Sequence, residues 1–233
     1  MATPKNDVCI GMITSGNVHM AVVQSLLGAV MNGGARWIYI QQSGPYLDDA
    51  RNNLIGTFMN EAFKDCDRLL MVDSDVEFTS DDIQRLVDDN RPVVSGVYHS
   101  MYEDGIHPVV YEWSDYGEKT LRVPDKRCKT GYRLEYGRTM TPIKTWPATA
   151  EEQPLVKVDG CGAGFLMIKR DVIMEFIKHH EPPQIWFAED VIGGTHFGED
   201  LCFNVRCAEL GIDTWVDRRV QLAHHKNIRL QGS

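Results

Sequence analysis

The amino-acid sequence predicts an α/β domain with a mostly parallel central sheet, flanked by helices and interrupted by one irregular insertion. Apolar runs of strand length alternate with segments of helical periodicity over residues 8–98, a pattern typical of a parallel sheet covered on both faces. The pattern weakens over about 101–154 and resumes from residue 155. A length of 233 residues suits one such fold, so we expect a single domain over 1–233.

Residues 8–98 contain the clearest elements. Each expected strand is a short aliphatic run, and each expected helix has apolar residues at three- and four-residue spacing. Asn32-Gly33-Gly34 ends the first helix, and Thr79 or Ser80 caps the third. In order, the expected elements are strand Val8–Ile13, a helix with apolar residues from Val18 to Val30, strand Trp37–Gln41, helix Asp49–Phe63, the strand that leads from Arg68 into Asp73-Ser74-Asp75, a short helix with Ile83, Leu86 and Val87, and strand Pro92–Tyr98.

The second half of the chain is less regular until the insertion ends. The segment Glu181–Thr195 is either a lid with a glycine hinge or a plain surface loop, and its Pro182-Pro183 ends the preceding helix. The expected elements are hairpin segments Val109–Trp113 and Gly131–Tyr136, strands Val156–Asp159 and Phe165–Lys169, helix Asp171–His179, a helix from Gly198-Glu199-Asp200 to Gly211, and strands Trp215–Val216 and Val220–His224.

The composition argues against several classes of function. A formal net charge of −9 argues against a nucleic-acid partner, because phosphate binding needs a basic surface. No apolar stretch approaches the ~18 residues of a membrane span, and the N-terminus lacks the features of a signal peptide. The six cysteines contain no Cys-x-x-Cys pair, which argues against zinc and indicates reduced thiols in a cytoplasmic protein.

Asp73 and Asp75 follow a buried strand and are separated by one residue. Because side chains alternate along a strand, both carboxylates reach the same rim of the sheet while Ser74 points the other way. Oxygen ligands of this kind suit Mg²⁺ or Mn²⁺, and a cation with few protein ligands keeps positions open for a diphosphate. The alternative is a strand-end turn with solvated acids, but the surrounding strand and helix favour a metal site.

Arg51 and Asn52 lie near the start of the helix that precedes this strand. A guanidinium in this place is suited to a phosphate, and the amide to a base or ribose. The alternative is an ordinary helix start with capping and surface charge. The neighbouring Asp pair favours a ligand role for Arg51.

Three glycines, Gly160, Gly162 and Gly164, follow Asp159 at alternate positions. They let the backbone pass close to a ligand or to another chain segment, and a β-bulge or tight bend explains them equally well. The spacing is not G-x-G-x-x-G, so it predicts no dinucleotide site.

Two further pairs are candidates for the site. Glu199 and Asp200 open a helix, where the dipole alone explains two carboxylates, or one of them acts as a general base or holds an acceptor hydroxyl. His224 and His225 end the last strand and face opposite sides, so only one can point at a site. We favour His224 as the third metal ligand, since one imidazole with carboxylates suits Mn²⁺ somewhat better than Mg²⁺.

In combination these motifs resemble glycosyltransferases of the GT-A fold, especially short single-domain members encoded by bacteriophages. The resemblance covers residues 8–98 and 155–225, whereas the insertion matches no known pattern. It rests on Val8–Ile13, Ala50-Arg51-Asn52, Asp73-Ser74-Asp75, the Asp159–Phe165 glycine turn, Gly198-Glu199-Asp200 with Arg206, Ala208, Leu210 and Gly211 downstream, and Val220–His224.

The resemblance implies a hexosyltransferase-type enzyme that uses Mn²⁺ (or Mg²⁺), a UDP- or GDP-sugar donor and a protein or glycan acceptor, in the host cytoplasm if the gene is a phage gene. Asp200 would act as the base if the enzyme inverts, or only orient the acceptor if it retains. The implied residues are Asp73, Asp75 and His224 for the metal; Thr14, Arg51, Asn52, Asp73 and Ser74 for the nucleotide; Asp159, Gly160, Gly162 and Trp186 for the sugar or acceptor; and Asp200 with Glu199 for catalysis.

Two other functions stay open. A sugar-phosphate nucleotidyltransferase would need a first loop rich in glycine and arginine, which Thr14-Ser15-Gly16-Asn17 does not supply. A non-catalytic module that binds sugar or nucleotide on the same fold is distinguished only by a turnover assay.

Overall fold

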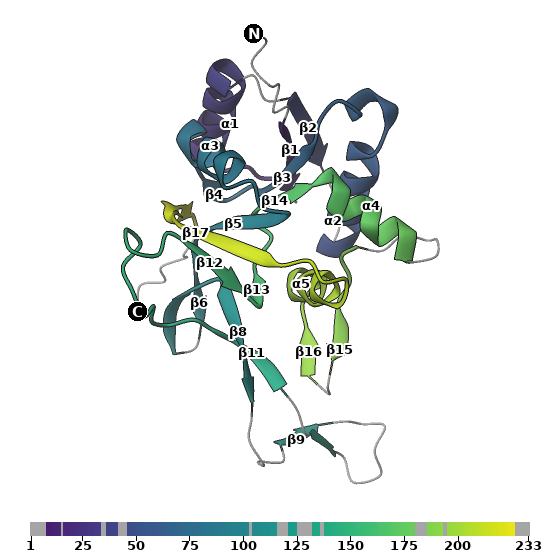
Figure 1. Ribbon diagram of the computed structural model, residues 1–233, viewed down its shortest axis with the longest axis vertical. Helices are drawn as coiled ribbons and strands as arrows, with labels where there is room; N and C mark the ends of the chain where they lie inside the picture. Colours follow the sequence, from purple (N-terminus) through teal and green to yellow (C-terminus); the bar gives the residue numbers. More distant parts are fainter. Residues whose placement is uncertain are drawn as a thin grey trace, which may run out of the picture.

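The computed structural model describes residues 8–14, 16–33, 36–41, 46–102, 104–115, 121–124, 132–135, 138–179, 186–192 and 195–226. Its centre is a seven-stranded sheet in which five strands run in one direction and β12 and β14 run in the other (Figure 1). The strand order is β12 (Leu155–Val158), β17 (Thr214–Gln221), β5 (Val93–Val97), β14 (Phe165–Lys169), β3 (Arg68–Asp73), β1 (Val8–Thr14) and β2 (Arg36–Gln41). The predicted mostly parallel α/β sheet is confirmed, with β14 inserted antiparallel between β3 and β5.

Helices cover both faces of this sheet. The helices are α1 (Met20–Gly33), α2 (Leu47–Phe58), α3 (Ser80–Asp89), α4 (Arg170–His179) and α5 (Glu199–Glu209), with a short 3₁₀ helix at Glu61–Phe63. In Figure 1, α1 and α3 lie on one side of the sheet, and α2, α4 and α5 lie on the other. No helix among the described residues is both long and apolar enough to cross a membrane.

The two hydrophobic cores explain why β3 is a continuous apolar run. Leu69 and Met71 enter the core beneath α2, α4 and α5, whereas Leu70 and Val72 enter the core beneath α1 and α3. Side chains alternate along a strand, so a strand buried on both faces needs an apolar residue at every position. This sheet therefore holds the end of β3, and with it Asp73, in a fixed place.

Two expected elements differ most from the structure. The helix expected over Asp49–Phe63 ends at Phe58. Beyond this end, Arg170 of α4 donates to the carbonyls of Phe58 and Phe63, which satisfies groups that a longer helix would have paired itself. The last two expected strands are one strand, β17, with an irregular register between Val216 and Gln221. As predicted, Thr79 caps α3, here in a capping box with Asp82.

The insertion contains short antiparallel pairs. β6 (His99–Tyr102) pairs with β7 (Gly105–Pro108), and β9 (Leu121–Pro124) pairs with β10 (Tyr132–Glu135). A three-stranded sheet joins β11 (Arg138–Pro142), β8 (Val110–Asp115) and β13 (Gly160–Cys161). Two further pairs join β4 (Val76–Glu77) to β18 (Ala223–His224), and β15 (Asp190–Ile192) to β16 (Thr195–Phe197).

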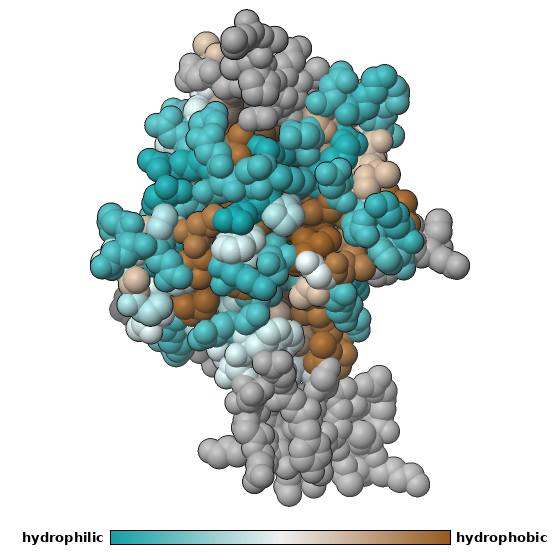
Figure 2. Space-filling view, in the orientation of Figure 1, coloured by the Kyte–Doolittle hydropathy of each residue, from teal (hydrophilic) through white to brown (hydrophobic). Residues whose placement is uncertain are grey.

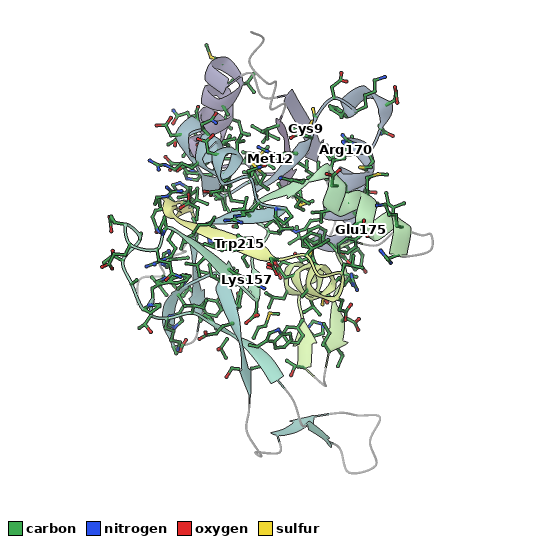
Figure 3. The ribbon with its side chains drawn as sticks, viewed as in Figure 1. Cys9, Met12, Lys157, Arg170, Glu175 and Trp215 are labelled. Carbon is green, nitrogen blue, oxygen red and sulfur yellow. The ribbon has the colours of Figure 1, made fainter. Side chains whose placement is uncertain are left out.

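Hydrophilic and hydrophobic side chains gather on different parts of the surface. Figure 2 shows hydrophilic side chains over α3, and hydrophobic ones gathered near α5 and the β15–β16 hairpin. The edge strand β12 pairs Lys157 with Trp215 of β17, and the two lie side by side in Figure 3. The five cysteines within the described residues are buried and outside any disulfide.

Candidate active site

A pocket of about 380 Å³ opens at the carboxyl ends of β1 and β3. In α/β sheets this edge is the usual place for a ligand. Its walls come from β1, the β3–β4 turn, the Tyr98–Tyr102 segment, β8 and the β18 segment. The lining residues are Ile13, Thr14, Leu47, Asp73, Ser74, Asp75, Tyr98, Ser100, Tyr102, Val109, Tyr111, His224 and Lys226.

The structure brings Asp75 and His224 together, as the sequence predicts. The pairing of β18 with β4 places His224 opposite Val76, so its Nε2 lies 3.3 Å from Asp75 Oδ2. Lys226 Nζ lies 2.8 Å from the same oxygen. Burial alone would raise the pKa of Asp75, but hydrogen bonds from His224 and Lys226 lower it to about 2. Asp75 is therefore a carboxylate at neutral pH.

His224 is oriented by its other ring nitrogen. Nδ1 lies 2.7 Å from the carbonyl oxygen of His99, and because a carbonyl only accepts, Nδ1 carries the proton. Nε2 is then the ring nitrogen that faces Asp75, and a histidine held through Nδ1 by a backbone carbonyl has the orientation of a metal-binding histidine. His225 faces away from this pocket, 2.8 Å from Glu77 and stacked on His19.

Few side chains near Asp75 and His224 could serve as metal ligands. Among the described residues, no group of three His, Cys, Asp or Glu side chains converges closely enough to hold a metal ion. Asp73, the first carboxylate of the motif, faces Arg51 instead, with Oδ1 at 3.2 Å and Oδ2 at 3.4 Å from Nη2. Asp75 and His224 thus meet at one point, and Asp73 stands beside them in the same pocket.

Arg51 is a buried link between Asp73 at the end of β3 and Glu199 at the start of α5. Its side chain is 2 % exposed, and it donates from Nε to Glu199, from Nη1 to the carbonyl of Ala163 and from Nη2 to Asp73. Burial alone would lower the pKa of Arg51, yet Asp73 and Glu199 raise it above its ordinary value. The geometry gives Arg51 a positioning role, since its nitrogens bind protein oxygens and the side chain is outside the lining of the pocket.

Asn52 likewise holds another chain segment. Its Oδ1 accepts from the backbone N–H groups of Trp186 and Phe187, and its Nδ2 donates to the carbonyl of Phe187. Trp186 itself is buried, and its indole Nε1 has no hydrogen-bond partner within the described part of the chain. Neither residue lines the 380 Å³ pocket.

Glu199 and Asp200 form the first turn of α5, as predicted. Glu199 Oε1 binds Arg51 Nε at 3.2 Å, and Asp200 Oδ1 accepts from the Leu201 N–H at 2.8 Å. Burial, and then the charge of Glu199, raises the pKa of Asp200 to about 6. Asp200 is beyond the pocket lining, but its charge acts on Tyr98, Tyr102 and Tyr111, which do line it.

The glycine turn makes room for protein side chains. A Cβ at Gly162 would lie 2.1 Å from the Tyr98 hydroxyl oxygen and 2.6 Å from Val109 Cγ1. A Cβ at Gly160 would lie 2.9 Å from both Leu201 and Met140. Of the alternatives that the sequence left open, close approach to another chain segment is observed, together with a turn at Ala163-Gly164.

Asp159 and Thr14, both predicted site residues, line two different pockets. Asp159 Oδ2 accepts from the Trp113 N–H at 2.8 Å, and Asp159 lines a second pocket of about 410 Å³ between β12 and α5. Thr14 and Ser74 line the first pocket. Ser74 was expected to point away from Asp73 and Asp75, but β3 ends at Asp73, so strand alternation does not extend to Ser74. Thr14 Oγ1 donates to the carbonyl of Asn17 and accepts from the Gly16 N–H, so it shapes the loop after β1.

Sequence reasoning missed eight of the residues that line the pocket, and four of these carry a phenol or an ammonium group: Tyr98, Tyr102, Tyr111 and Lys226. Tyr98 accepts from the Gly164 N–H at 3.1 Å and its ring meets His224 edge-on at 5.3 Å. The hydroxyls of Tyr102 and Tyr111 lie 2.7 Å apart. The sequence could have indicated two of them, because Lys226 follows His224 by two residues and Tyr98 ends a predicted strand. Tyr102 and Tyr111 belong to the insertion, where the sequence has no such pattern.

Comparisons with known proteins support the fold. No protein-family model matches the chain, and no curated protein sequence matches it. The structure of A197 from STIV is similar, with a TM-score of 0.56 at 16% identity over 95% of this chain and 86% of that chain. A structure of GalNAc-T7 with UDP, GalNAc and Mn²⁺ is similar with a TM-score of 0.54 at 11% identity, over 95% of this chain and 44% of that chain. At such identities the likeness concerns the fold, and the chain has a GT-A-like fold.

Proposed function

We propose that this protein is a glycosyltransferase that uses a nucleotide-diphosphate sugar. One observation carries the proposal: Asp73, Asp75 and His224 share one pocket at the carboxyl ends of β1 and β3 of a GT-A-like sheet. The GalNAc-T7 structure of the same fold contains UDP, GalNAc and Mn²⁺, which supports a nucleotide-sugar donor and a divalent cation here.

A divalent cation, Mn²⁺ or Mg²⁺, fits the donors present. Asp75 is ionised, and because Nδ1 of His224 is used by the carbonyl of His99, Nε2 is the nitrogen that would bind a cation. Asp75 and His224 would hold it, with Asp73 nearby and the remaining positions left to diphosphate oxygens and water. Such a cation would neutralise the charge of the departing diphosphate.

Asp200 is proposed to meet the acceptor. A carboxyl group whose pKa is about 6 is mostly ionised at pH 7 and still basic enough to accept a proton from an acceptor hydroxyl. In an inverting enzyme Asp200 is the base; in a retaining one it orients the hydroxyl. In the inverting case we expect the transfer rate to fall below about pH 6 as Asp200 becomes protonated, and Asp200→Asn to reduce the rate about 10²–10⁴-fold.

The first test is a thermal-shift panel of UDP, GDP, CDP and TDP, each with and without Mn²⁺. A nucleotide at ~100 times its Kd stabilises the chain by about 2.7 kcal/mol, which for this size raises the melting temperature by about 5–10 °C. We expect one nucleotide to give a shift that requires Mn²⁺, and the matching nucleotide sugar to release its diphosphate on incubation.

Matched variants connect the result to the site. Asp75→Ala should abolish the Mn²⁺-dependent shift, whereas Asp213→Ala, which removes an exposed carboxylate paired with Lys157 elsewhere, should leave it unchanged. A panel without any shift contradicts the proposed function. A shift without turnover points to a binding module, and an Asp200→Asn variant with the full transfer rate excludes Asp200 as the base.

A further inference from the structure

The ammonium group of Lys226 is bonded to the Asp75 carboxylate, which is one of the two ligands proposed for the metal ion. Lys226 Nζ lies 2.8 Å from Asp75 Oδ2, the same oxygen that His224 Nε2 approaches at 3.3 Å. Two cations at one oxygen repel each other, and a divalent ion carries twice the charge of an ammonium group. A metal ion held between Asp75 Oδ2 and His224 would therefore compete with Lys226 for this oxygen.

A displaced Lys226 has one suitable destination in the pocket. Among the described residues that line it, Lys226 is the only lysine or arginine. Asp73, the other carboxylate of the pocket, is already bound by Arg51. A diphosphate carries at least two negative charges, and a lysine on a flexible stem is a common phosphate ligand.

The backbone next to Lys226 is held by several contacts, so only the side chain has to move for Lys226 to leave Asp75. The N–H of His225 donates to the carbonyl of Asp75 at 2.8 Å, and the His225 ring binds Glu77 and stacks on His19 at 3.8 Å. The Lys226 side chain is 52% exposed, which leaves it room to rotate.

We propose that Lys226 exchanges between two partners: it pairs with Asp75 in the metal-free protein and moves to the diphosphate of the donor once a divalent cation binds Asp75 and His224. The proposal rests on the proposed function and adds a consequence to it, namely that the metal binds before the donor. Lys226 then makes donor binding conditional on the metal, because its ammonium group becomes available only after displacement.

The test compares the whole chain with Lys226→Ala, and with Lys178→Ala as the matched control. Lys178 forms a 2.8 Å ion pair with Glu175 on α4 and is 64% exposed, so it reproduces the pair without the pocket. The Mn²⁺ affinity is measured by electron paramagnetic resonance with MnCl₂ alone. The UDP and GDP affinities are then measured by calorimetry at saturating Mn²⁺.

The two measurements should move in opposite directions in Lys226→Ala. Removing an exposed competing ion pair should tighten Mn²⁺ binding by up to about fivefold. Losing a charge-assisted hydrogen bond to phosphate should weaken nucleotide binding by about tenfold or more. Lys178→Ala should change neither.

Mn²⁺ binding that is unchanged, weaker or absent in Lys226→Ala overturns the exchange at Asp75. If Lys226→Ala binds the nucleotides as tightly as the wild type does, Lys226 does not bind the diphosphate of the donor. If the wild type binds neither UDP nor GDP, the proposed function fails, while the MnCl₂ titration still decides whether Lys226 competes for Asp75.

Discussion

Removal of the Arg51 guanidinium should both destabilise the fold and shift the pH dependence of the site. Arg51→Met leaves Glu199, which is 12% exposed, and Asp73, which is 27% exposed, without their buried partner. Breaking a buried ion pair on one side costs about 3–5 kcal/mol, and the partial exposure of Asp73 favours the lower end. For this chain length about 3 kcal/mol lowers the melting temperature by about 6–12 °C.

The same variant should move the acidic limb of the transfer rate to higher pH. The charge of Arg51 lowers the pKa of Asp200, so its loss lets burial and Glu199 raise that pKa further above about 6. The measurements are a thermal melt and a pH–rate profile.

A second buried arginine provides the control. Arg170→Met removes hydrogen bonds to the carbonyls of Cys66, Phe58 and Phe63, so it should lower the melting temperature without moving the pH limb. An Arg51→Met variant that melts within 2 °C of the wild type, on the scale of about 2–4 °C per kcal/mol, would refute the reasoning.

Two other perturbations have clear expected results. Gly162→Ala places a Cβ 2.1 Å from the Tyr98 hydroxyl and should cost about 3 kcal/mol in urea unfolding, whereas Gly56→Ala, an open position in α2, should gain about 0.5–1 kcal/mol; equal stabilities would contradict the packing argument. Burial and the charge of Asp217 raise the pKa of Asp89 to about 6, so ionised Asp89 costs stability as the pH rises through 6. Asp89→Asn should therefore melt about 2–4 °C higher at pH 7.5 and show no gain below about pH 4, and a gain that is independent of pH would contradict it.

The sequence predicted the elements whose signals are local. The run Leu69–Val72 is apolar at every position because both of its faces are buried, and Thr79 caps α3 because its hydroxyl reaches the N–H of Asp82. The site residues Asp75 and His224 also followed from strand ends, since both lie where β3 and β18 deliver them to one edge.

The remaining features depend on partners far away in the sequence. The hydrogen bond from Arg51 to Glu199 spans 148 positions, and without it the motif around Arg51 predicts a surface ligand as readily as a buried link. Tyr102 and Tyr111 belong to an insertion without periodicity, so only the folded chain brings their hydroxyls to the pocket. The reason for the glycine at position 162 is the close approach of Tyr98, which the sequence alone does not indicate.

The antiparallel strand β14 also determines when this sheet can assemble. Both neighbours of β5 in the sheet, β14 and β17, come from the second half of the chain, although β5 itself ends at Val97. A nascent chain that has reached residue 100 therefore holds β5 without any pairing partner, and the core on both sides of β3 stays open until Lys169 has been made. Such long-range pairing slows folding. Synthesis of most of the chain thus precedes closure of the sheet, and a fragment that ends before β14 should be captured by chaperones rather than fold.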